Sequence, residues 1–400
     1  MNSMPGTWAP ISVPAGPVGV NLVYDKLLRA LDGGEILAPI PQVSRHFPAA
    51  LVARIESAIN PDFAPQPGTV AILTTSGSTG NPRAVEFTVD SLIALNAHIN
   101  TGAVIDQQFD AAPQWIAALP VTSIGGLNVL TRAADTGMSP IPLASVAGAA
   151  AFSIDEVVVA VNQCVHAPAA ISLVPTQLRR LLGSEEGTNA LKRCALVLIG
   201  GSSTPVSDQI RCLDEGISVA FTYGMTETTG GCVFSGTPAP GVEISIDATT
   251  SVITISGTTI ASGYRPSQAE LSEPEVSGAT FQPFNSHFTT SDVGDVGADG
   301  SLHVLGRIDD IVIVNGVNIS LGAIKEVLDS EPTITDSFVM PNLTALVVAT
   351  TPLGEFEERL RTEIAQQLGA LAVPSFLAVP ELPHLPNGKH DRTQIQNLYG

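Results

Sequence analysis

The stretch TTSGSTGNPR (residues 74–83) combines hydroxyl side chains and glycines with a terminal arginine. Glycines let backbone N–H groups come close to a phosphate, and hydroxyl groups add further hydrogen-bond donors. The order of residues matches neither GxxxxGKS/T nor GxGxxG, and a flexible linker can have the same composition. However, the strand-like sequence VAILTT (residues 70–75) runs directly into the stretch, and Arg83 is one of only 18 lysines and arginines. We therefore interpret the stretch as a phosphate-binding loop.

Four further stretches follow it in the chain: TYGMTET (222–228), TTSDVG (289–294), GRIDD (306–310) and LPNGKHDR (385–392). Together with the first stretch they resemble, in order, the signature motifs of the adenylate-forming superfamily. That superfamily contains acyl- and aryl-CoA ligases, luciferases and the adenylation domains of peptide synthetases. The resemblance covers nearly the whole chain from about residue 68.

The resemblance assigns roles to particular residues. It implies that Thr226 donates to the α-phosphate of ATP, that Glu227 binds magnesium, that Lys389 is catalytic and that Asp309 is the pivot of a hinge. The residues that it implies bind ATP are Thr75, Ser76, Gly77, Ser78, Thr79, Gly80, Arg83, Thr222, Tyr223, Gly224, Met225, Asp292 and Arg307. The family usually has lysine where Arg83 stands and glycine where Ala84 stands.

Three local stretches resemble, within that superfamily, the ligases that activate o-succinylbenzoate for menaquinone biosynthesis. They are LPVTSIGGLNVL (119–130), SLVPTQL (172–178) and TYGMTETTGGCV (222–233). The implied acyl-substrate residues are Ser123, Arg132, Thr176, Gly201, Ser202, Gly230 and Gly231. The two adjacent glycines would leave room for a flat aryl group, and Arg132 would pair either with the succinyl carboxylate or with a structural carboxylate. Related ligases tend to carry a histidine near the position of Thr122 and Ser123.

The implied chemistry uses ATP, Mg²⁺ and CoA. A carboxylate would attack the α-phosphate of ATP to give an acyl-adenylate, and the thiolate of CoA would then attack the acyl carbonyl and release AMP. Three alternatives stay open at this point. They are another aryl- or acyl-CoA ligase, a catalytically silent nucleotide-binding relative, and an adenylation module that loads a carrier protein.

Composition narrows the class of protein. The chain has 400 residues, 44% of them hydrophobic and 14% charged, which is typical of globular domains. A formal net charge of −20 argues against binding nucleic acid or an anionic membrane. We find no signal peptide and no run of about 18 apolar residues that would span a membrane. The oligomeric state stays open, with a homodimer compatible with the sequence.

The cysteines and histidines show no ligand spacing. The four cysteines form no CxxC pair, and the seven histidines form no HExxH motif. We therefore expect no disulfide framework and no zinc site, and a reducing cytoplasm fits best.

The apolar pattern predicts an α/β fold. Strand-like WIAALP, AAISLVP, ALVLIGG and SVAFTYG alternate with helix-like DEVVVAVNQ and PTQLRRLL, and TVDSLIALNAHI predicts a further helix that begins at Thr88 or Asp90. Short β-branched runs over residues 241–305 predict a small β region. We expect a large layered N-terminal domain (residues 1–306) that binds ATP and the acyl substrate. A small mobile α+β lid domain (residues 307–400) would follow, with a hairpin at Asn315-Gly316.

Overall fold

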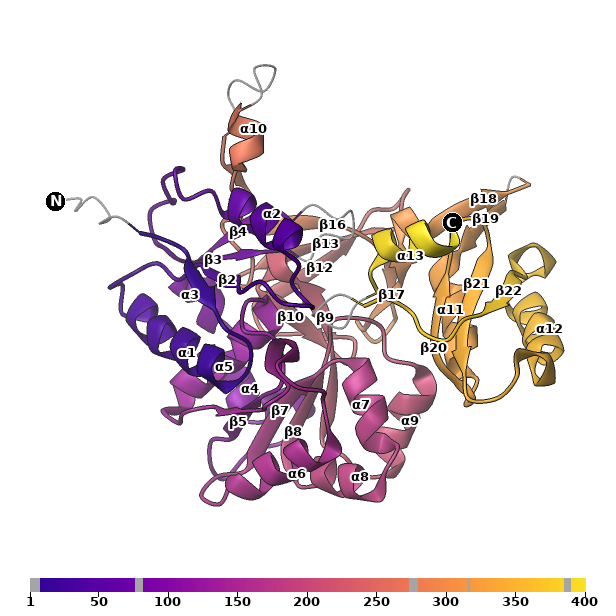
Figure 1. Ribbon diagram of the computed structural model, residues 1–400, viewed down its shortest axis with the longest axis horizontal. Helices are drawn as coiled ribbons and strands as arrows, with labels where there is room; N and C mark the ends of the chain where they lie inside the picture. Colours follow the sequence, from indigo (N-terminus) through magenta and orange to yellow (C-terminus); the bar gives the residue numbers. More distant parts are fainter. Residues whose placement is uncertain (1–7, 76–81, 273–279, 316, 385–389) are drawn as a thin grey trace.

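The computed structural model describes residues 8–75, 82–272, 280–315, 317–384 and 390–400 (Figure 1). Six of the predicted site residues lie outside these ranges: Ser76, Gly77, Ser78, Thr79, Gly80 and Lys389. The fold is mixed α/β, as predicted, with a large N-terminal part and a smaller C-terminal part. Among the described helices, none combines the length and the apolar character needed to cross a membrane.

A seven-stranded sheet forms the centre of the N-terminal part, with strand order β11-β10-β9-β8-β7-β5-β6. The strands from β6 to β9 run parallel, whereas β10 and β11 are antiparallel. The strands are β5 (Gln114–Ala117), β6 (Ile141–Pro142), β7 (Ala169–Leu173), β8 (Cys194–Ile199), β9 (Val219–Met225), β10 (Gly230–Phe234) and β11 (Thr237–Pro238). Every residue of β7 is buried, as expected for a parallel strand covered on both faces. The four predicted strands of this sheet are confirmed.

Helices connect the parallel strands, so the carboxyl ends of these strands lie at one edge of the sheet. The helices are α5 (Ile124–Thr136), α6 (Ile154–Gln163), α7 (Pro175–Leu182), α8 (Glu185–Lys192) and α9 (Val206–Asp214). Both helices predicted for this region, now α6 and α7, are confirmed. A capping box of Ser153 and Glu156 starts α6, which satisfies two otherwise unpaired N–H groups.

The prediction of a single helix over TVDSLIALNAHI is wrong, because the structure has two helices there, α3 (Val89–Ile93) and α4 (Asn96–Asn100). Thr88, rather than Asp90, caps α3 by accepting a hydrogen bond from the Ser91 backbone N–H. The side-chain amides of Asn96 and Asn100 donate to backbone carbonyls of α5, at 3.1 and 3.2 Å. These tertiary hydrogen bonds fix the orientation of α4, which the local sequence could not specify.

Three smaller sheets surround the central one, with strand orders β15-β14-β4-β3, β12-β13-β16-β17 and β1-β2. Their strands are β1 (Ile11–Val13), β2 (Pro39–Pro41), β3 (Thr69–Thr74), β4 (Ala84–Thr88), β12 (Val242–Ile246), β13 (Val252–Gly257), β14 (Gly263–Tyr264), β15 (Gln282–Pro283), β16 (His287–Val296) and β17 (Leu302–Arg307). The remaining helices of this part are α1 (Pro17–Leu31), α2 (Ala49–Ile59) and α10 (Gln268–Ser272). The predicted phosphate loop connects β3 to its antiparallel partner β4, so it is no linker between domains.

A buried ion pair joins β4 to the residue that follows β14. The side chains of Glu86 and Arg265 are both fully buried and form a salt bridge. Thr69 Oγ1 donates to the Glu86 carboxylate at 2.5 Å, the Gln66 backbone N–H donates to it at 2.8 Å, and Arg265 Nε donates to the Ile59 carbonyl at 3.0 Å. The pair therefore fixes the position of β14 against β4.

We expect Glu86→Ala to lower the free energy of unfolding by about 3–5 kcal/mol, because it leaves the Arg265 guanidinium buried without its carboxylate. Both tryptophans, Trp8 and Trp115, lie in the N-terminal part, so urea unfolding followed by tryptophan fluorescence reports on the relevant region. Glu215→Ala removes an exposed ion pair and serves as the control, with an expected loss below about 1 kcal/mol. Equal losses in the two variants would contradict this account.

The C-terminal part has a hydrophobic cluster of its own, which includes Ile319, Ile324, Leu328 and Leu360. Its elements are β18 (Ile311–Val314), β19 (Val317–Ser320), α11 (Leu321–Ser330), β20 (Ile334–Val339), β21 (Thr344–Ala349), α12 (Glu357–Leu368), β22 (Ser375–Ala378) and α13 (Arg392–Tyr399). The predicted hairpin of β18 and β19 is confirmed. Figure 1 shows this part, in orange and yellow, on one side of the N-terminal part. The boundary between residues 306 and 307 stays a prediction.

Candidate active site

Three residues predicted to bind ATP meet although they lie on separate strands. Tyr223, near the end of β9, donates its hydroxyl to Asp292 Oδ2 on β16 at 2.8 Å. Arg307, the last residue of β17, is the cross-strand partner of Asp292, and its Nη1 lies 3.5 Å from Asp292 Oδ1. Burial and the adjacent carboxylate of Asp292 raise the pKa of Tyr223, so the phenol remains a hydrogen-bond donor. The Asp292 carboxylate is thus held in place and is suited to accept hydrogen bonds from a diol such as ribose.

Glu227 lies in the short 3-10 helix η3 (Thr226–Thr228), directly after β9. Its side chain is buried and accepts a hydrogen bond from the Tyr264 hydroxyl. The Glu227 carbonyl accepts a hydrogen bond from the Ala261 N–H at 3.0 Å. Burial and the charge of Glu227 raise the pKa of Tyr264, which keeps Tyr264 a donor. The chain therefore positions one carboxylate immediately beside Thr226.

Arg83 extends this arrangement toward the predicted phosphate loop. Its guanidinium carbon lies 3.3 Å from the centre of the Tyr264 ring, and its Nη2 donates to Gln282 Oε1 at 2.8 Å. Arg83 therefore contacts the Tyr264 ring, and the Tyr264 hydroxyl contacts Glu227. The sequence motifs include Arg83 and Glu227 but not Tyr264, because an isolated tyrosine after a short strand carries no recognisable signal.

The two described ends of the phosphate loop are hydrogen-bonded to each other. The Thr75 N–H donates to the Arg83 carbonyl at 2.8 Å, and the Arg83 N–H donates to Thr75 Oγ1 at 3.1 Å. Ala84, where the family usually has glycine, is fully buried in a hydrophobic cluster. The methyl group of Ala84 therefore fits the core, and this departure from the family motif does not disturb β4.

The predicted acyl-substrate residues follow neighbouring strands of the central sheet. Ser123 comes after β5, Thr176 after β7, and Gly201 and Ser202 after β8. Carboxyl ends of parallel strands form the usual ligand-binding edge of such a sheet. Ser123 Oγ donates to the Pro120 carbonyl at 2.7 Å. Thr176, Gly201 and Ser202 are exposed to solvent.

Glycines on both sides of Glu227 have a packing role that the sequence did not reveal. A Cβ atom on Gly224 would lie 1.9 Å from the Gly230 carbonyl oxygen, and one on Gly231 would lie 2.8 Å from Thr222 Cβ. Gly230 has a φ of 90°, a conformation that favours glycine. The close pairing of β9 and β10 therefore needs these glycines, and their predicted role in making room for an aryl group stays a prediction.

Arg132 of α5 has a buried side chain that lies beside Ser172, near the carboxyl end of β7. Its Nη1 lies 3.5 Å from Ser172 Oγ, and its guanidinium carbon lies 5.1 Å from the centre of the Trp115 ring. Burial lowers the pKa of Arg132 to about 10. Among the described residues, no carboxylate lies within ion-pair distance of Arg132 and its Nε has no hydrogen-bond partner. The alternative of a structural ion pair is therefore wrong for this arginine.

A small cavity of about 10 Å³, roughly the room for one water molecule, lies beside Arg132. Its lining includes four buried polar atoms without a hydrogen-bond partner: Asn128 Oδ1, Arg132 Nε, Thr229 Oγ1 and Thr259 Oγ1. Gly231 also lines it. Buried polar atoms are rarely left unpaired, so a cluster of four around one cavity indicates a place for a bound water molecule or a polar group of that size.

The remaining predicted residues lie on β9, directly after it, or between the two parts of the chain, and the roles assigned to them stay predictions. Thr222, Gly224 and Met225 belong to β9, and Thr226 begins η3. Asp309 lies in the 3-10 helix η5 (Ile308–Asp310), between the N-terminal and C-terminal parts. Magnesium prefers one or two carboxylates together with phosphate oxygens, and the buried carboxylate of Glu227 beside Thr226 fits that preference.

Comparison with known proteins identifies the family of the chain. The model of the family described as "AMP-binding enzyme" matches residues 30–264. Over 400 aligned residues the chain is 31% identical to a protein of Mycobacterium tuberculosis (strain CDC 1551 / Oshkosh) named "Probable 2-succinylbenzoate--CoA ligase", covering 96% of this chain and 97% of the relative. The 2-succinylbenzoate--CoA ligase of Bacillus subtilis (strain 168) is 26% identical over 401 residues, covering 94% of this chain and 75% of the relative.

Solved structures share the fold. The o-succinylbenzoate CoA synthetase of Bacillus subtilis, in complex with the acyl-adenylate intermediate OSB-AMP, has a TM-score of 0.70 at 22% identity, covering 98% of this chain and 88% of that chain. Klebsiella oxytoca NpsA, in complex with 3-hydroxyanthranilyl-AMSN, has a TM-score of 0.76 at 15% identity, covering 98% and 89%. The family model matches more than half of the chain, and the Mycobacterium tuberculosis relative aligns over nearly the full length of both chains. These two findings show that the chain belongs to the AMP-binding enzyme family.

Proposed function

We propose that this protein is an ATP-dependent, AMP-forming ligase that activates o-succinylbenzoate as an acyl-adenylate and transfers the acyl group to CoA, a step of menaquinone biosynthesis. The observation that carries the proposal is the convergence of Tyr223, Asp292 and Arg307 near the end of β9, the strand that leads directly into Thr226 and Glu227. The similarity over the full length to a protein named as a probable 2-succinylbenzoate--CoA ligase supports the choice of substrate.

In this function Asp292 accepts hydrogen bonds from the ribose hydroxyls of ATP, while the Tyr223 hydroxyl and Arg307 hold its carboxylate in place. Thr226 donates to the α-phosphate. Glu227, oriented by Tyr264, would hold Mg²⁺, which supplies positive charge to the phosphate oxygens. Arg83 and the loop that begins at Thr75 bind the departing pyrophosphate.

The first step brings two anions together. At about 4 Å and an effective dielectric constant near 20, the repulsion between two unit charges is roughly 4 kcal/mol. Lys389 offsets this repulsion as the substrate carboxylate oxygen bonds to the α-phosphorus and the bond to the β-phosphate oxygen breaks. In the second step the CoA sulfur bonds to the acyl carbon, and the bond from that carbon to the AMP oxygen breaks.

A hinge separates the two steps in this proposal. Lys389 is needed only for the first step, and CoA needs access for the second, so the C-terminal part rotates about Asp309. In the structure Arg179 of α7 donates to the carbonyls of Ile334 and Thr335 on β20, at 3.5 and 3.3 Å. These two hydrogen bonds of Arg179, at 3.3 Å or longer, are weak enough to be compatible with such a rotation.

The direct experiment incubates the purified protein with ATP, Mg²⁺, CoA and o-succinylbenzoate and measures the thioester by mass and pyrophosphate by a coupled assay. A panel of benzoate, aminobenzoates and aliphatic acids tests the choice of substrate. We expect o-succinylbenzoate to give the highest kcat/KM. Turnover of another acid at a higher kcat/KM would overturn the substrate, and absence of ATP–pyrophosphate exchange with every acid would overturn the reaction.

The cavity beside Arg132 leads to a prediction about the second carboxylate of the substrate. o-Succinylbenzoate has two carboxylates, one of which is activated, and a buried arginine whose Nε has no hydrogen-bond partner among the described residues is suited to bind the other. We expect Arg132→Met to raise the KM for o-succinylbenzoate by about 10- to 100-fold, as for loss of a charged hydrogen bond, with the KM for ATP unchanged. The cavity must enlarge for this binding, since its volume is only about 10 Å³.

Two analogues of the substrate, each lacking one of the carboxylates, serve as the control for Arg132→Met. The analogue that lacks the carboxylate bound by Arg132 should be used equally well by the unchanged protein and the variant. The variant should also unfold at the same or a higher temperature, because a buried charge is replaced by an apolar side chain of similar volume. Unchanged kinetics with o-succinylbenzoate would contradict a role for Arg132 in substrate binding.

Location and assembly remain part of the proposal. A cytoplasmic location is supported by four cysteines that are all free thiols. A homodimer is a prediction that sedimentation equilibrium of the purified protein can check.

A further inference from the structure

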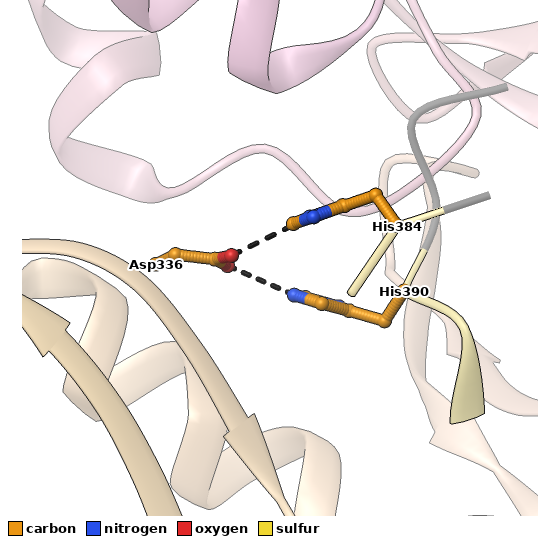
Figure 2. Close-up of side chains that lie close together, drawn as sticks. All are labelled: Asp336, His384 and His390. Atoms are coloured by element: carbon orange, nitrogen blue, oxygen red, sulfur yellow. Dashed lines mark hydrogen bonds and ion pairs between the residues drawn. The ribbon is translucent and has the colours of Figure 1, made fainter. Parts of the chain in front are cut away.

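Asp336, His384 and His390 form a compact cluster in the C-terminal part (Figure 2). Asp336 lies on β20, and the two histidines lie between β22 and α13, where they pair as an antiparallel bridge. His390 Nε2 lies 2.8 Å from Asp336 Oδ1, and His384 Nε2 lies 3.4 Å from Asp336 Oδ2. Each histidine therefore points one ring nitrogen at a different oxygen of the same carboxylate.

The hydrogen bond on the far side of His384 determines which of its nitrogens carries the proton. His384 Nδ1 lies 2.9 Å from the Leu382 carbonyl oxygen, which can only accept, so Nδ1 is the donor. In the neutral imidazole Nε2 then presents a lone pair to Asp336 Oδ2, and two acceptors face each other. A cation between them converts this unfavourable contact into ligation. A backbone carbonyl that holds the second ring nitrogen is also the usual way in which metal-binding histidines are oriented.

The geometry of the three ligands suits a transition-metal ion. One nitrogen from each histidine and one oxygen from Asp336 lie within 4.8 Å of one another. Ligand atoms bound tetrahedrally to zinc at about 2.1 Å lie about 3.4 Å from one another, so shifts of roughly 1.5 Å or less in the distances between these atoms would place an ion among them. Two imidazoles and a carboxylate select zinc and its neighbours, whereas Mg²⁺ prefers oxygen ligands.

The surroundings are compatible with a bound cation. The charge of the Lys325 ammonium group contributes to lowering the pKa of both Asp336 and His384. Lys325 forms an ion pair with Asp329, so its charge is largely offset. The ring of Phe338 packs edge-on against His390 at 5.5 Å between centroids and restricts the rotation of that imidazole.

We propose that Asp336, His384 and His390 bind a divalent transition-metal ion such as Zn²⁺, at a site separate from the Mg²⁺ that Glu227 serves. His384 and His390 precede and follow residues 385–389 in the sequence. The ion therefore links β20 to both histidines that flank the segment containing Lys389. The sequence predicted no zinc site, because two histidines six positions apart and a distant aspartate match no ligand motif.

The test is titration of chelator-treated protein, without nucleotide, by isothermal calorimetry with Zn²⁺ and by visible absorption with Co²⁺. We expect one equivalent of metal per chain and a rise in the unfolding temperature by a few degrees on saturation. His384→Ala, His390→Ala and Asp336→Asn should each weaken binding by at least about 10-fold. Their urea midpoints without metal show whether each variant is folded.

Two matched variants exclude binding elsewhere. His303→Ala removes an exposed histidine that lies 3.0 Å from Asp295 without a second histidine, and Cys164→Ser removes the only thiol that is not buried; both should bind Zn²⁺ as the unchanged protein does. Two results would overturn the site. One is Zn²⁺ binding in all three cluster variants that is as tight as in the unchanged protein. The other is Zn²⁺ binding by the unchanged protein that is no tighter than in the variants. Ligase activity with Mg²⁺ is measured separately, so failure of the metal site is distinguishable from failure of the proposed function.

Discussion

Lys389→Ala is expected to slow formation of the acyl-adenylate by about 10²- to 10³-fold, the loss typical for one donor that stabilises a transition state. The lysine belongs to LPNGKHDR, the motif that resembles the family's catalytic segment. Its neighbour His390 contacts Asp336 of β20, so one end of the segment has a fixed position in the C-terminal part. In the proposed mechanism the charge of Lys389 acts while two anions approach each other, which happens in the first step.

The second half-reaction separates this role from a general loss of structure. With acyl-adenylate and CoA supplied directly, the Lys389→Ala variant should form thioester at nearly the rate of the unchanged protein. Lys192→Ala, which removes an exposed lysine of the N-terminal part, should leave both rates unchanged. If Lys389→Ala slowed both half-reactions equally, the assignment of Lys389 to adenylation would be wrong.

Glu227→Gln is expected to lower the rate of adenylation by about 10²-fold or more, because magnesium contributes several kcal/mol to charge stabilisation at phosphate. Glutamine keeps the size of the side chain and can still accept the hydrogen bond that Tyr264 donates. The change therefore removes the charge while leaving the packing of η3 intact. Rates measured over a range of Mg²⁺ concentrations should show a higher requirement for the ion.

Two further variants define what Glu227 does. Tyr264→Phe removes the hydroxyl that orients Glu227, so we expect a smaller loss with the same weaker dependence on Mg²⁺. Glu243→Gln changes an exposed carboxylate on β12 and should have no effect. An unchanged Mg²⁺ requirement in Glu227→Gln would assign the metal to other residues.

Much of the fold was predictable because its strands and helices have clear local patterns. The apolar run of β7 and the capping residues of α6 are properties of neighbouring residues. The helix over TVDSLIALNAHI was mispredicted as one piece because the break before Asn96 depends on hydrogen bonds to α5, some 35 positions away. Local propensity does not contain such contacts.

The chemical types in the candidate site were predictable from short stretches of sequence, because Thr226, Glu227, Asp292 and Arg307 stand in ordered motifs. Only the tertiary structure placed the Tyr223 hydroxyl on Asp292, 69 positions away, and Tyr264 on Glu227, 37 positions away.

Among the described residues, tertiary structure likewise gave Arg132 no carboxylate partner, and it brought Asp336 to His384 and His390. The physical reason is that spacing along the chain encodes turns, caps and buried faces. The partner of a buried polar atom is chosen by how distant strands pack, which no short stretch of residues records.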